Sequence, residues 1–572
     1  MSLTDWLVLS ATLLLIVLYG IWKGRGTKNI DGYFLSDQEL PWYQVGLSVM
    51  ATQASAITFL SLPGQAYSNG VGFVQIYFGL PLAMVVLCIT FIPIFRNLNV
   101  YTAYEYLEKR FDNKTRTLTA LLFLIQRGLS TGITIYAPSI ILSSILNIDI
   151  VYTTIGMGGL VIVYTVYGGS KAVSYTQMLQ MGIIFTGLFV TAYMVVHLLP
   201  PEVGFFDALH IAGKMGKLNA IDAKFDLNNR YNIWSGIIGG FFLNLSYFGT
   251  DQSQVGRYLT GKSVTESRLG LIMNGLIKIP MQFLILLIGT LVFIFYQYHT
   301  PPVFFNKVEV EKIENSIYKD EYREIKNEYE KADKEKQLKV VALSKALDSG
   351  DDKNINESTI KLNEAEEELK TIKKSAAALI EKNSGEEKSK DADYVFLTFI
   401  TQQLPVGMIG LLIAIIFLAG MGSTAGGISA LASTTVIDFY KRLYKKEGDE
   451  KEYLNISRWA TLGWGLFCVV VALYTNRFGN LIEAVNILGS LFYGTILGIF
   501  LVAFYMKSIG GTAVFTAALI SEAFIIFAWK TELMAFLWLN VIGCAVVMLL
   551  SWVIQVMLVK PPFLPKDNNT LT

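Results

Sequence analysis

Thirteen apolar stretches dominate this sequence, and each is long enough to cross the roughly 30 Å hydrocarbon core of a bilayer. They lie at about 3–22, 41–67, 71–95, 118–146, 150–168, 174–199, 232–256, 270–298, 405–440, 455–475, 479–506, 510–529 and 533–558. Such a chain is predicted to be an all-α polytopic membrane protein, because helices satisfy their own backbone hydrogen bonds in lipid. We expect about 13 transmembrane helices in the inner or plasma membrane.

Charged residues are concentrated in one segment. Residues 307–393 hold 18 Lys/Arg and 23 Asp/Glu, although only 16% of the whole chain is charged. This segment indicates one soluble insert between membrane spans. The 53% hydrophobic content excludes a disordered chain, and the net charge of +1 excludes a nucleic-acid-binding protein. Three separated cysteines form no recognisable disulfide framework or thiolate metal site.

The distribution of Lys and Arg predicts the orientation. No Lys or Arg precedes the first stretch, which therefore resembles an anchor with its amino end outside rather than a signal peptide. The loops then assigned to the cytoplasm hold 21 Lys/Arg, and the short external loops hold six. We expect the amino terminus and the insert outside and the carboxyl terminus in the cytoplasm.

The insert, residues 303–393, is predicted to be an extracytoplasmic hairpin of two antiparallel helices. Apolar residues recur at helical spacing on both sides of a break at 348–352. They are Ile313, Ile317, Tyr318, Ile325 and Tyr329, then Leu362, Ala365, Leu369, Ile372, Ala376 and Leu379. Such a hairpin is either a solvated decoration or a docking surface for an extracytoplasmic partner protein.

Two of the apolar stretches contain small and polar residues. The second holds 51–58 (ATQASAIT) and Pro63-Gly64, and the seventh holds Gly239-Gly240, Asn244, Ser246 and Tyr247. This composition favours discontinuous helices, whose freed carbonyls can hold ions and substrate at mid-membrane. Close helix packing through small residues is the alternative.

These two stretches lie five apart, which suggests two five-helix halves that enter the membrane from opposite sides. This inverted repeat is the plan of many secondary transporters. We divide the chain into an extra amino-terminal transmembrane helix (1–30), a first repeat (41–200), a second repeat interrupted by the insert (232–298 and 395–506) and two carboxyl-terminal helices (510–560).

Two basic residues lie within apolar stretches. Arg127 is nine residues into the fourth stretch, roughly 13 Å deep, at a cost near 3 kcal/mol. No acidic residue of that stretch neutralises it. A guanidinium is the natural bidentate partner of a carboxylate, so Arg127 either awaits an anionic substrate or caps carbonyls of a broken helix. Lys278 is a second anion contact or extends toward the cytoplasm.

Four segments resemble the sodium:solute symporter family, which includes sodium-coupled sugar, proline, iodide and sialic acid transporters. They are "ATQASAITFLSLPGQAY" (51–67), "YGGSKAVSYTQMLQ" (167–180), "NLSYFGTDQSQVGRYLTGKS" (244–263) and "AGMGSTAGGISALASTTVIDFYK" (419–441). The resemblance covers about 480 residues, with residues 307–393 outside it. It implies the inverted-repeat fold, transport by alternating access, and Na⁺ as the coupling ion.

The resemblance also implies a main sodium site between the second and ninth stretches. By position, this site uses the carbonyls of Ala51, Ala54 and Ala419 and the hydroxyl of Ser423. Such hard oxygen ligands suit a small hard cation. The family usually has two consecutive hydroxyl residues here, but Gly422 takes the first position. One ligand is missing unless Thr424 or water replaces it.

A second sodium site of some family members is predicted to be absent. Its aspartate position is Gln177 in this chain, and its hydroxyl positions are Ala425 and Gly426.

The resemblance also assigns substrate positions. They are Ser55, Thr58, Tyr77, Asn244 and Tyr247, and Arg127 matches the arginine that holds the acid group in sialic acid transporters. Hydroxyl and amide groups suit a sugar-like solute. Tyr77 stands where sugar-binding members have a carboxylate, so a neutral hexose is less favoured.

The coupling energy limits which solute one sodium ion can concentrate. Movement down 100 mV yields about 2.3 kcal/mol, and a tenfold gradient adds about 1.4 kcal/mol, which together sustain roughly 500-fold accumulation of a neutral solute. A monoanion moved with one Na⁺ carries no net charge, so only about tenfold accumulation remains. Either the solute is neutral or zwitterionic, or another Na⁺ or a proton joins in, or modest accumulation suffices.

The sequence therefore predicts a secondary active transporter that imports a small polar organic solute with sodium, with a carboxylated sugar or other organic acid as the first solute to consider. The alternatives are a proton-coupled transporter and a transporter-like solute sensor or scaffold that signals through the insert. An enzyme is disfavoured because His197, His210 and His299 form no metal-spaced cluster and no nucleophile and base are paired. A channel would need a continuous polar lining.

Overall fold

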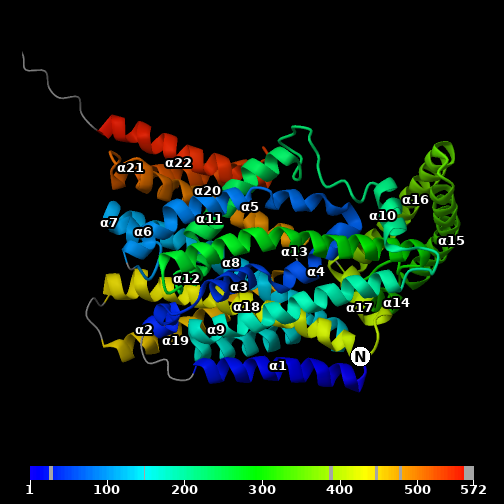
Figure 1. Ribbon diagram of the computed structural model, residues 1–572, viewed down its shortest axis with the longest axis horizontal. Helices are drawn as coiled ribbons and strands as arrows, with labels where there is room; N and C mark the ends of the chain where they lie inside the picture. The colour runs from blue at the N-terminus through cyan, green and yellow to red at the C-terminus, as the bar shows by residue number, and fades with distance from the viewer. Residues whose placement is uncertain are drawn as a thin grey trace, which may run out of the picture.

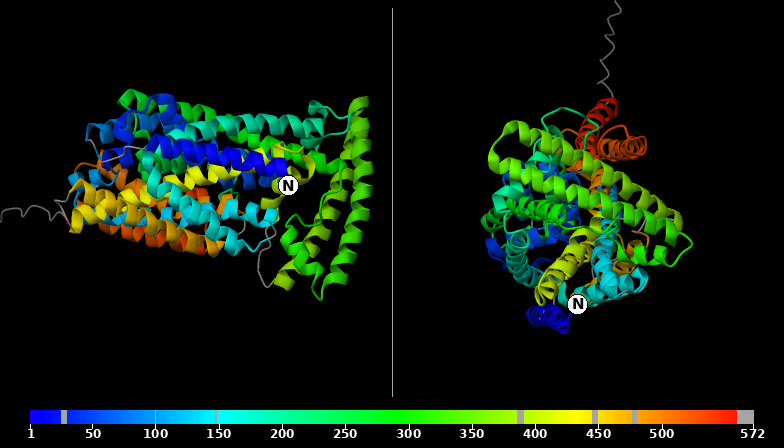
Figure 2. Two further views of the ribbon diagram at one scale, coloured as in Figure 1. Left: turned by 90° about the horizontal axis from the view of Figure 1, so that it is seen from below. Right: turned by 90° about the vertical axis from the view of Figure 1, so that its right-hand side faces the viewer.

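Long helices run side by side along the long axis of the molecule (Figure 1). The computed structural model describes residues 1–24, 30–98, 100–146, 148–384, 391–444, 449–475 and 480–558. Two helices of the insert, α15 (Lys319–Ser349) and α16 (Asp352–Ser384), lie across one end of the bundle, here called the insert end (Figures 1 and 2). The described ranges contain no β-strand, only an isolated bridge between Leu40 and Gly261. The predicted all-α fold is confirmed.

The other helices follow in chain order. Before the insert they are α1 (Leu3–Gly24), α2 (Ile30–Leu35), η1 (Ser36–Gln38), α3 (Trp42–Gln53), α4 (Ala56–Asn69), η2 (Val71–Tyr77), α5 (Leu80–Val86), η3 (Leu87–Phe91), α6 (Ile92–Asn97), α7 (Glu105–Arg110), α8 (Asn113–Leu146), α9 (Ile150–His197), α10 (Phe205–Lys214), η4 (Ser235–Gly239), α11 (Gly240–Thr250), α12 (Gln252–Tyr258) and α13 (Val264–Tyr298). From the insert on they are α14 (Lys307–Glu314), α17 (Ala392–Gln403), α18 (Met408–Thr434), η5 (Thr435–Tyr444), α19 (Glu450–Leu473), α20 (Leu481–Tyr505), α21 (Gly511–Lys530) and α22 (Phe536–Leu558).

Ten helices in the described residues are long and apolar enough to cross a membrane, or eleven if the bent pair α3–α4 counts as one span. Two of the thirteen predicted spans do not form such a helix. Residues 150–168 give only a shorter apolar segment, Ile150–Val163, and residues 232–256 are divided among η4, α11 and α12. The number thirteen and the inverted repeat are therefore not confirmed and remain predictions.

The predicted boundary between the fifth and sixth spans is also different. We expected separate spans at 150–168 and 174–199, but both belong to one 48-residue helical element, α9. Glycine is unfavourable but tolerated within a helix, so Gly168-Gly169 does not end this element. At 1.5 Å per residue, a helix of this length would span about 72 Å if straight, more than twice the hydrocarbon thickness.

The predicted break in the second span is confirmed. α3 ends at Gln53 and α4 begins at Ala56, and their axes meet at 61°. Ala54 and Ser55 form the break, with ψ angles of 80° and 171°. Because α3 ends inside the bundle, carbonyls of its last turn lack intrahelical donors.

The seventh span also contains a break, which lies at Asp251. Gly239 and Gly240 are helical, whereas Asp251 has a ψ angle of 117° and separates α11 from α12. The Asp251 carboxylate caps α12 by accepting a hydrogen bond from Ser253 N at 2.8 Å. A capping side chain, rather than glycine, marks the break.

The insert forms the predicted hairpin, preceded by the additional short helix α14. Gly350, between α15 and α16, has a φ angle of 67°, the left-handed conformation that favours glycine. The predicted stripe from Leu362 to Leu379 is buried, but Ile317 is 90% exposed and lies outside the apolar face. Predictions for residues 385–390 lie outside the described residues.

The hairpin packs against the transmembrane bundle. Val340, Leu343 and Leu362 belong to the same buried cluster as the transmembrane helices. The Lys336 ammonium donates to the carbonyl of Tyr296, near the end of α13, at 2.9 Å. Since this apolar face is covered by the protein itself, the predicted docking of an extracytoplasmic protein finds no support.

The two termini lie at opposite ends of the bundle. The amino terminus is at the insert end, and α22 ends at the far end (Figures 1 and 2). At the far end, the Arg116 guanidinium donates to Glu108 at 2.6 Å and to Asp438 at 2.8 Å. These contacts join α7 and α8 to η5.

Candidate functional site

A cavity of about 100 Å³ lies beside the break between α3 and α4. Six of the seven predicted substrate residues line it: Ser55, Thr58, Tyr77, Arg127, Asn244 and Tyr247. They come from the α3–α4 break, α4, η2, α8 and α11, so the fold brings distant parts of the chain together. The volume equals that of a few water molecules, and drug-sized ligands usually occupy 300–1,000 Å³. A sugar acid requires this site to widen.

The polar side chains of α11 are held by neighbouring groups. The Asn244 amide donates to the carbonyl of Gly240 at 2.7 Å. The Tyr247 hydroxyl accepts a hydrogen bond from Gln254 at 2.6 Å, and its ring faces the Arg127 guanidinium at 5.4 Å. These contacts fix an aromatic wall on one side of the cavity.

Arg127 is paired with a carboxylate of the protein, which corrects the expectation of an unneutralised guanidinium. Its Nη2 donates to Asp251, and the Tyr493 hydroxyl donates to the same carboxylate oxygen at 2.8 Å. The Asp251 side chain is fully buried and that of Arg127 is 11% exposed. The partner was missed because it lies in the seventh span rather than in that of Arg127.

The ion pair leaves at least one donor of Arg127 available. Its Nε is buried and has no hydrogen-bond partner among the described residues. The other carboxylate oxygen of Asp251 accepts from Ser253 N and from its hydroxyl, at 2.8 Å and 2.6 Å. The pair therefore closes the cavity with almost no net charge while keeping at least one unsatisfied N–H group.

Lys278 does not line this cavity, so this arrangement gives no support to its assignment as a second anion contact. It also does not extend toward the membrane border, because its side chain is completely buried in α13. Among the described residues its ammonium has no hydrogen-bond partner. Asn274 and Gln282, one turn away on either side, likewise have unsatisfied polar atoms.

The predicted sodium ligands are distributed over two elements in contact. Ala51 and Ala54 lie at the end of α3, and Ala419 and Ser423 lie on α18. Gly420 allows α18 to approach the break, because a Cβ atom there would lie 3.2 Å from the Cβ of Ala56. The Ser423 hydroxyl donates to the Ala419 carbonyl at 2.9 Å, so these two oxygens are adjacent.

The hydroxyl of Thr424 is buried and has no partner among the described residues. An unsatisfied buried oxygen on α18 fits a residue that replaces the missing ligand. A Cβ atom at Gly422 would lie 2.5 Å from Oε1 of Gln180, so a side chain at 422 would require Gln180 to shift. The oxygen donors present therefore suit a small hard cation.

A neutral amide occupies the position that the family resemblance assigns to a second sodium site. Gln177 donates to the Thr52 hydroxyl at 3.1 Å and to the Gly422 carbonyl at 3.2 Å. It accepts from the Ser48 hydroxyl at 2.6 Å. Close by, an Arg257 nitrogen lies 3.3 Å from the place of a Cβ atom at Gly426. These contacts tie α3, α9 and α18 together.

Several residues of the cavity were not foreseen. Besides Asp251 behind its wall, Gln53, Ser130, Asn486 and Tyr493 contribute to its lining or polar contacts. Asn486 is a polar residue within the apolar eleventh stretch, which is the kind of signal that identified Asn244. Among the described residues, no three His, Cys, Asp or Glu side chains are grouped so as to hold a metal ion.

Comparison with known proteins agrees with this arrangement. The chain is 32% identical to the human sodium/iodide cotransporter over 275 residues, 47% of this chain and 42% of that protein. It is 32% identical to the Vibrio parahaemolyticus sodium/glucose cotransporter over 304 residues, 50% of this chain and 55% of that protein. The chain thus spans about half the length of these two relatives.

Two similarities extend over nearly the whole chain. The sodium/sialic acid symporter of Proteus mirabilis is 23% identical over 582 residues, 99% of this chain and 97% of that protein. A solved Na⁺-coupled sialic acid symporter, in a substrate-bound outward-open state, superposes with a TM-score of 0.74 at 21% identity, covering 97% of this chain and 98% of that one. This second likeness establishes the fold.

The family model of sodium:solute symporters matches residues 33–312 and 375–521. The unmatched residues between these two ranges fall in the insert, as the sequence resemblance predicts. Membership of this family of transporters supports Na⁺ as the coupling ion and a location in the membrane. The matched ranges make up well over half of the sequence, and the chain belongs to the sodium:solute symporter family.

Proposed function

We propose that this protein is a secondary active transporter that imports a small polar organic solute together with Na⁺ by alternating access. The observation that carries the proposal is the meeting of six predicted substrate residues in one cavity beside a broken helix. Such breaks expose backbone carbonyls where ions and substrates bind in secondary transporters.

A carboxylated sugar is the first solute class to test. Ser55, Thr58 and Asn244 provide hydroxyl and amide groups for sugar hydroxyls, and Arg127 provides a guanidinium for an acid group. The relative from Proteus mirabilis, which matches almost the full length, is a sodium/sialic acid symporter. This nearly full-length match favours an acidic sugar. The matches to iodide and glucose transporters cover only part of the chain and carry less weight.

Asp251 determines what happens when an acid solute enters. Its carboxylate already neutralises Arg127, so the solute's carboxylate must either displace it or bind at N–H groups that Asp251 does not use, such as the unpartnered Nε. If the solute displaces Asp251 from Arg127, the Asp251 carboxylate stays buried without its partner and is stable only with another cation or a proton. A neutral or zwitterionic solute does not have this requirement.

We further propose a single sodium site, formed by the carbonyls of Ala51, Ala54 and Ala419 and the hydroxyl groups of Ser423 and Thr424. The hydrogen bonds of Gln177 and the nearby guanidinium of Arg257 disfavour a second cation there. With one Na⁺, import of a monoanion is electrically neutral.

We propose that the insert end faces outside. The far end carries Arg110, whose guanidinium donates to the carbonyls of Met506 and Lys507 at 3.1 Å and 2.8 Å, and the group Lys109, Arg116 and Lys114. Basic residues accumulate on the cytoplasmic side of membrane proteins. The amino terminus is then outside and the carboxyl terminus inside.

Uptake by purified protein in proteoliposomes tests the proposal. Labelled N-acetylneuraminate, gluconate and glucose are supplied outside, with an inward Na⁺ gradient or with K⁺ in its place. We expect at least one solute to accumulate only with Na⁺. Uptake that is equal with Na⁺ and K⁺ for every solute would refute sodium coupling.

Arg127→Gln tests the assignment of the cavity, with Arg230→Gln as its matched control. Arg230 pairs with Glu483 at 2.8 Å, but its side chain is 54% exposed. The Arg127 variant should lose uptake of acid solutes, and the control should keep it. Normal uptake of an acid by Arg127→Gln would show that the acid binds at another site.

A further inference from the structure

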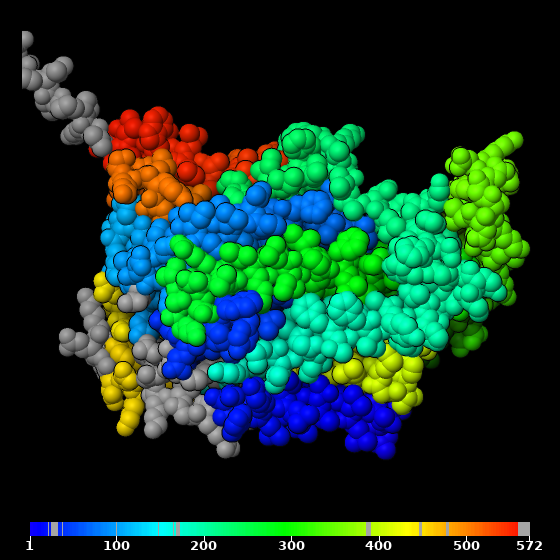
Figure 3. Space-filling model, viewed as in Figure 1, coloured from blue at the N-terminus to red at the C-terminus, as the bar shows by residue number. Residues whose placement is uncertain are grey.

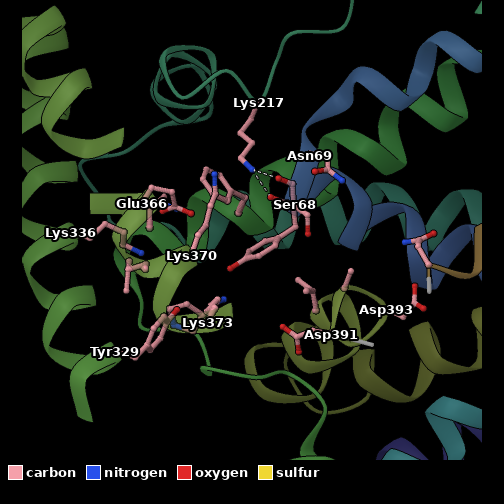
Figure 4. A pocket seen from close by; sticks show the side chains of 18 residues that line it. Ser68, Asn69, Lys217, Tyr329, Lys336, Glu366, Lys370, Lys373, Asp391 and Asp393 are labelled. Carbon is pink, nitrogen blue, oxygen red and sulfur yellow. Dashed lines mark hydrogen bonds between the residues drawn. The ribbon is translucent and has the colours of Figure 1, made fainter. Parts of the chain in front are cut away.

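A second and larger cavity, of about 560 Å³, lies between the hairpin and the ends of the transmembrane helices. Its walls come from α4, α13, α17 and the start of α20 on one side, and from α15 and α16 on the other (Figure 4). Its volume is within the range of sites for organic ligands. The hairpin provides one wall, although most of it lies outside the residues matched to the family.

This cavity and the central one are built on the same helices. Ser68 and Asn69, at the end of α4, line the outer cavity, and Ser55 and Thr58, at its beginning, line the central one. The ten residues from Thr58 to Ser68 correspond to about 15 Å of helix. Asn480 caps α20 and lines the outer cavity, while Ile482 of the same helix lines the central cavity. The two cavities are thus lined by residues about 15 Å apart along α4 and only two positions apart at the start of α20.

Four lysines and three carboxylates line the outer cavity, and most of the ammonium groups are already engaged. Lys217 donates to the carbonyls of Tyr67 and Ser68 at 2.8 Å and 2.7 Å, Lys336 pairs with Asp333 at 2.7 Å, and Lys370 pairs with Glu367 at 2.5 Å. Lys373, in contrast, has no hydrogen bond or ion pair within the described part of the chain, and its ammonium reaches the cavity (Figure 4).

Three aromatic rings hold the Lys373 ammonium in place. It lies 5.0 Å from the ring centre of Phe305, 5.5 Å from that of Tyr329 and 5.8 Å from that of Tyr67. Burial lowers the pKa of Lys373, although Asp391 and Glu366 act in the opposite direction. An anionic ligand would compensate this lost hydration and favour the charged form.

The carboxylates in the walls select for hydroxyl groups on the ligand. Asp391 accepts a hydrogen bond from the backbone N–H of Phe305. Glu366 lies 3.5 Å from the amide nitrogen of Gln297, whose buried oxygen has no partner among the described residues. Carboxylate and amide oxygens accept hydrogen bonds from hydroxyl groups, and aromatic rings contact the apolar faces of sugars.

We propose that this outer cavity is a second binding site for a hydroxylated organic acid, in which the Lys373 ammonium pairs with the acid group and Glu366 and Gln297 accept hydrogen bonds from hydroxyl groups. The site receives solute at the insert end before it reaches the central cavity. This role rests on the proposed function, but binding at the outer site does not require transport.

Protection of an introduced cysteine tests the proposal in the full-length protein. The native Cys88, Cys468 and Cys544 are buried, so Asn69→Cys provides one accessible thiol in the cavity wall. Its labelling by an uncharged maleimide is followed with N-acetylneuraminate, gluconate or glucose present. We expect at least one of the two acids to slow labelling in a saturable manner, and glucose to have a much smaller effect.

Variants in the Asn69→Cys background identify the binding group. Lys373→Gln should weaken protection by the acid about tenfold or more, because it removes a hydrogen bond to a charged group. Lys373→Arg should retain part of the protection because it keeps the charge. The matched control is Lys361→Gln on the same helix. The side chain of Lys361 is 59% exposed and pairs with Glu357. In this control the acid should protect the introduced cysteine as strongly as it does in Asn69→Cys alone.

Several results would overturn the proposal. They are no protection by either acid, equal protection by glucose, unchanged protection in Lys373→Gln, or no advantage of Lys373→Arg over Lys373→Gln when both variants fold. Arg127→Gln should leave protection intact, and its loss there would mean that residue 69 reports on the central cavity. If no sodium-dependent uptake is found but protection of the introduced cysteine by the acid depends on Lys373, only the proposed transport function is refuted.

Discussion

Replacing Asp251 with Asn provides the sharpest test of how Arg127 is held. The substitution keeps the shape of the side chain but removes its charge, which leaves the Arg127 guanidinium buried without a counter-charge. Asp251 is fully buried and Arg127 only 11% exposed, so solvent screens the pair weakly. Removing one partner of a buried ion pair typically costs about 3–5 kcal/mol. We expect a loss of this size in the free energy of unfolding.

The double variant Arg127→Gln/Asp251→Asn separates the ion pair from other effects of the mutations. Unfolding in mixed detergent micelles is measured for the wild type, both single variants and the double variant. Because neither charge remains, the double variant should lose clearly less than the sum of the single variants, with a coupling energy of up to about 3 kcal/mol. Additive losses would contradict a direct pair between these residues.

The same variants report on the solute. An acid that binds Arg127 in the wild type must compete with Asp251, whereas in Asp251→Asn it meets an unpaired guanidinium. We therefore expect N-acetylneuraminate or gluconate to raise the thermal midpoint of Asp251→Asn more than that of the wild type. Equal shifts in both proteins would refute the idea that Asp251 and the solute share one guanidinium.

Three further outcomes follow from other sites. Ser423→Ala should raise the half-saturating Na⁺ concentration for uptake about tenfold by removing one ligand; Ser433→Ala, which removes a similar hydroxyl from the same helix, should leave it unchanged. Lys278→Met should increase the free energy of unfolding by about 1 kcal/mol or more, because it replaces a buried ammonium without a partner in the described residues; a decrease would indicate a partner there. Burial raises the pKa of Asp391 to about 6, against the opposing effects of Lys373 and of backbone hydrogen bonds, so its contribution to stability falls as the pH rises from about 4 to 6. As the pH increases, the thermal midpoint of the wild type should therefore fall relative to that of Asp391→Asn. A constant difference between the two midpoints at every pH would exclude this effect.

The sequence predicted the features that depend on local pattern. The polar run 51–58 identified the break between α3 and α4, and the acidic segment 348–352 identified the turn of the hairpin. Ser55, Thr58 and Asn244 stood out as polar groups within membrane spans, and the family resemblance assigned them to the substrate site. Each of these inferences uses residues close together in the chain.

Features that depend on contacts between distant segments were missed. Asp251 lies within a recognised motif (244–263), but its pairing with Arg127, 124 positions away, becomes visible only when the fold brings α8 beside the break between α11 and α12. Lys278 lies near the beginning of its span, so a position at the membrane border was a reasonable expectation; packing of α13 buries it instead. The outer cavity forms between the hairpin and the ends of the transmembrane helices and has no sequence signature of its own.

The hairpin across the insert end has a practical consequence for imaging. It projects beyond the bundle (Figure 3) and is joined to it by apolar side chains that are continuous with the transmembrane core. An antibody fragment bound to its exposed face therefore cannot swivel freely relative to the membrane helices. Such a fragment gives electron cryomicroscopy a rigid, asymmetric landmark outside the detergent micelle, which fixes the alignment of individual particles.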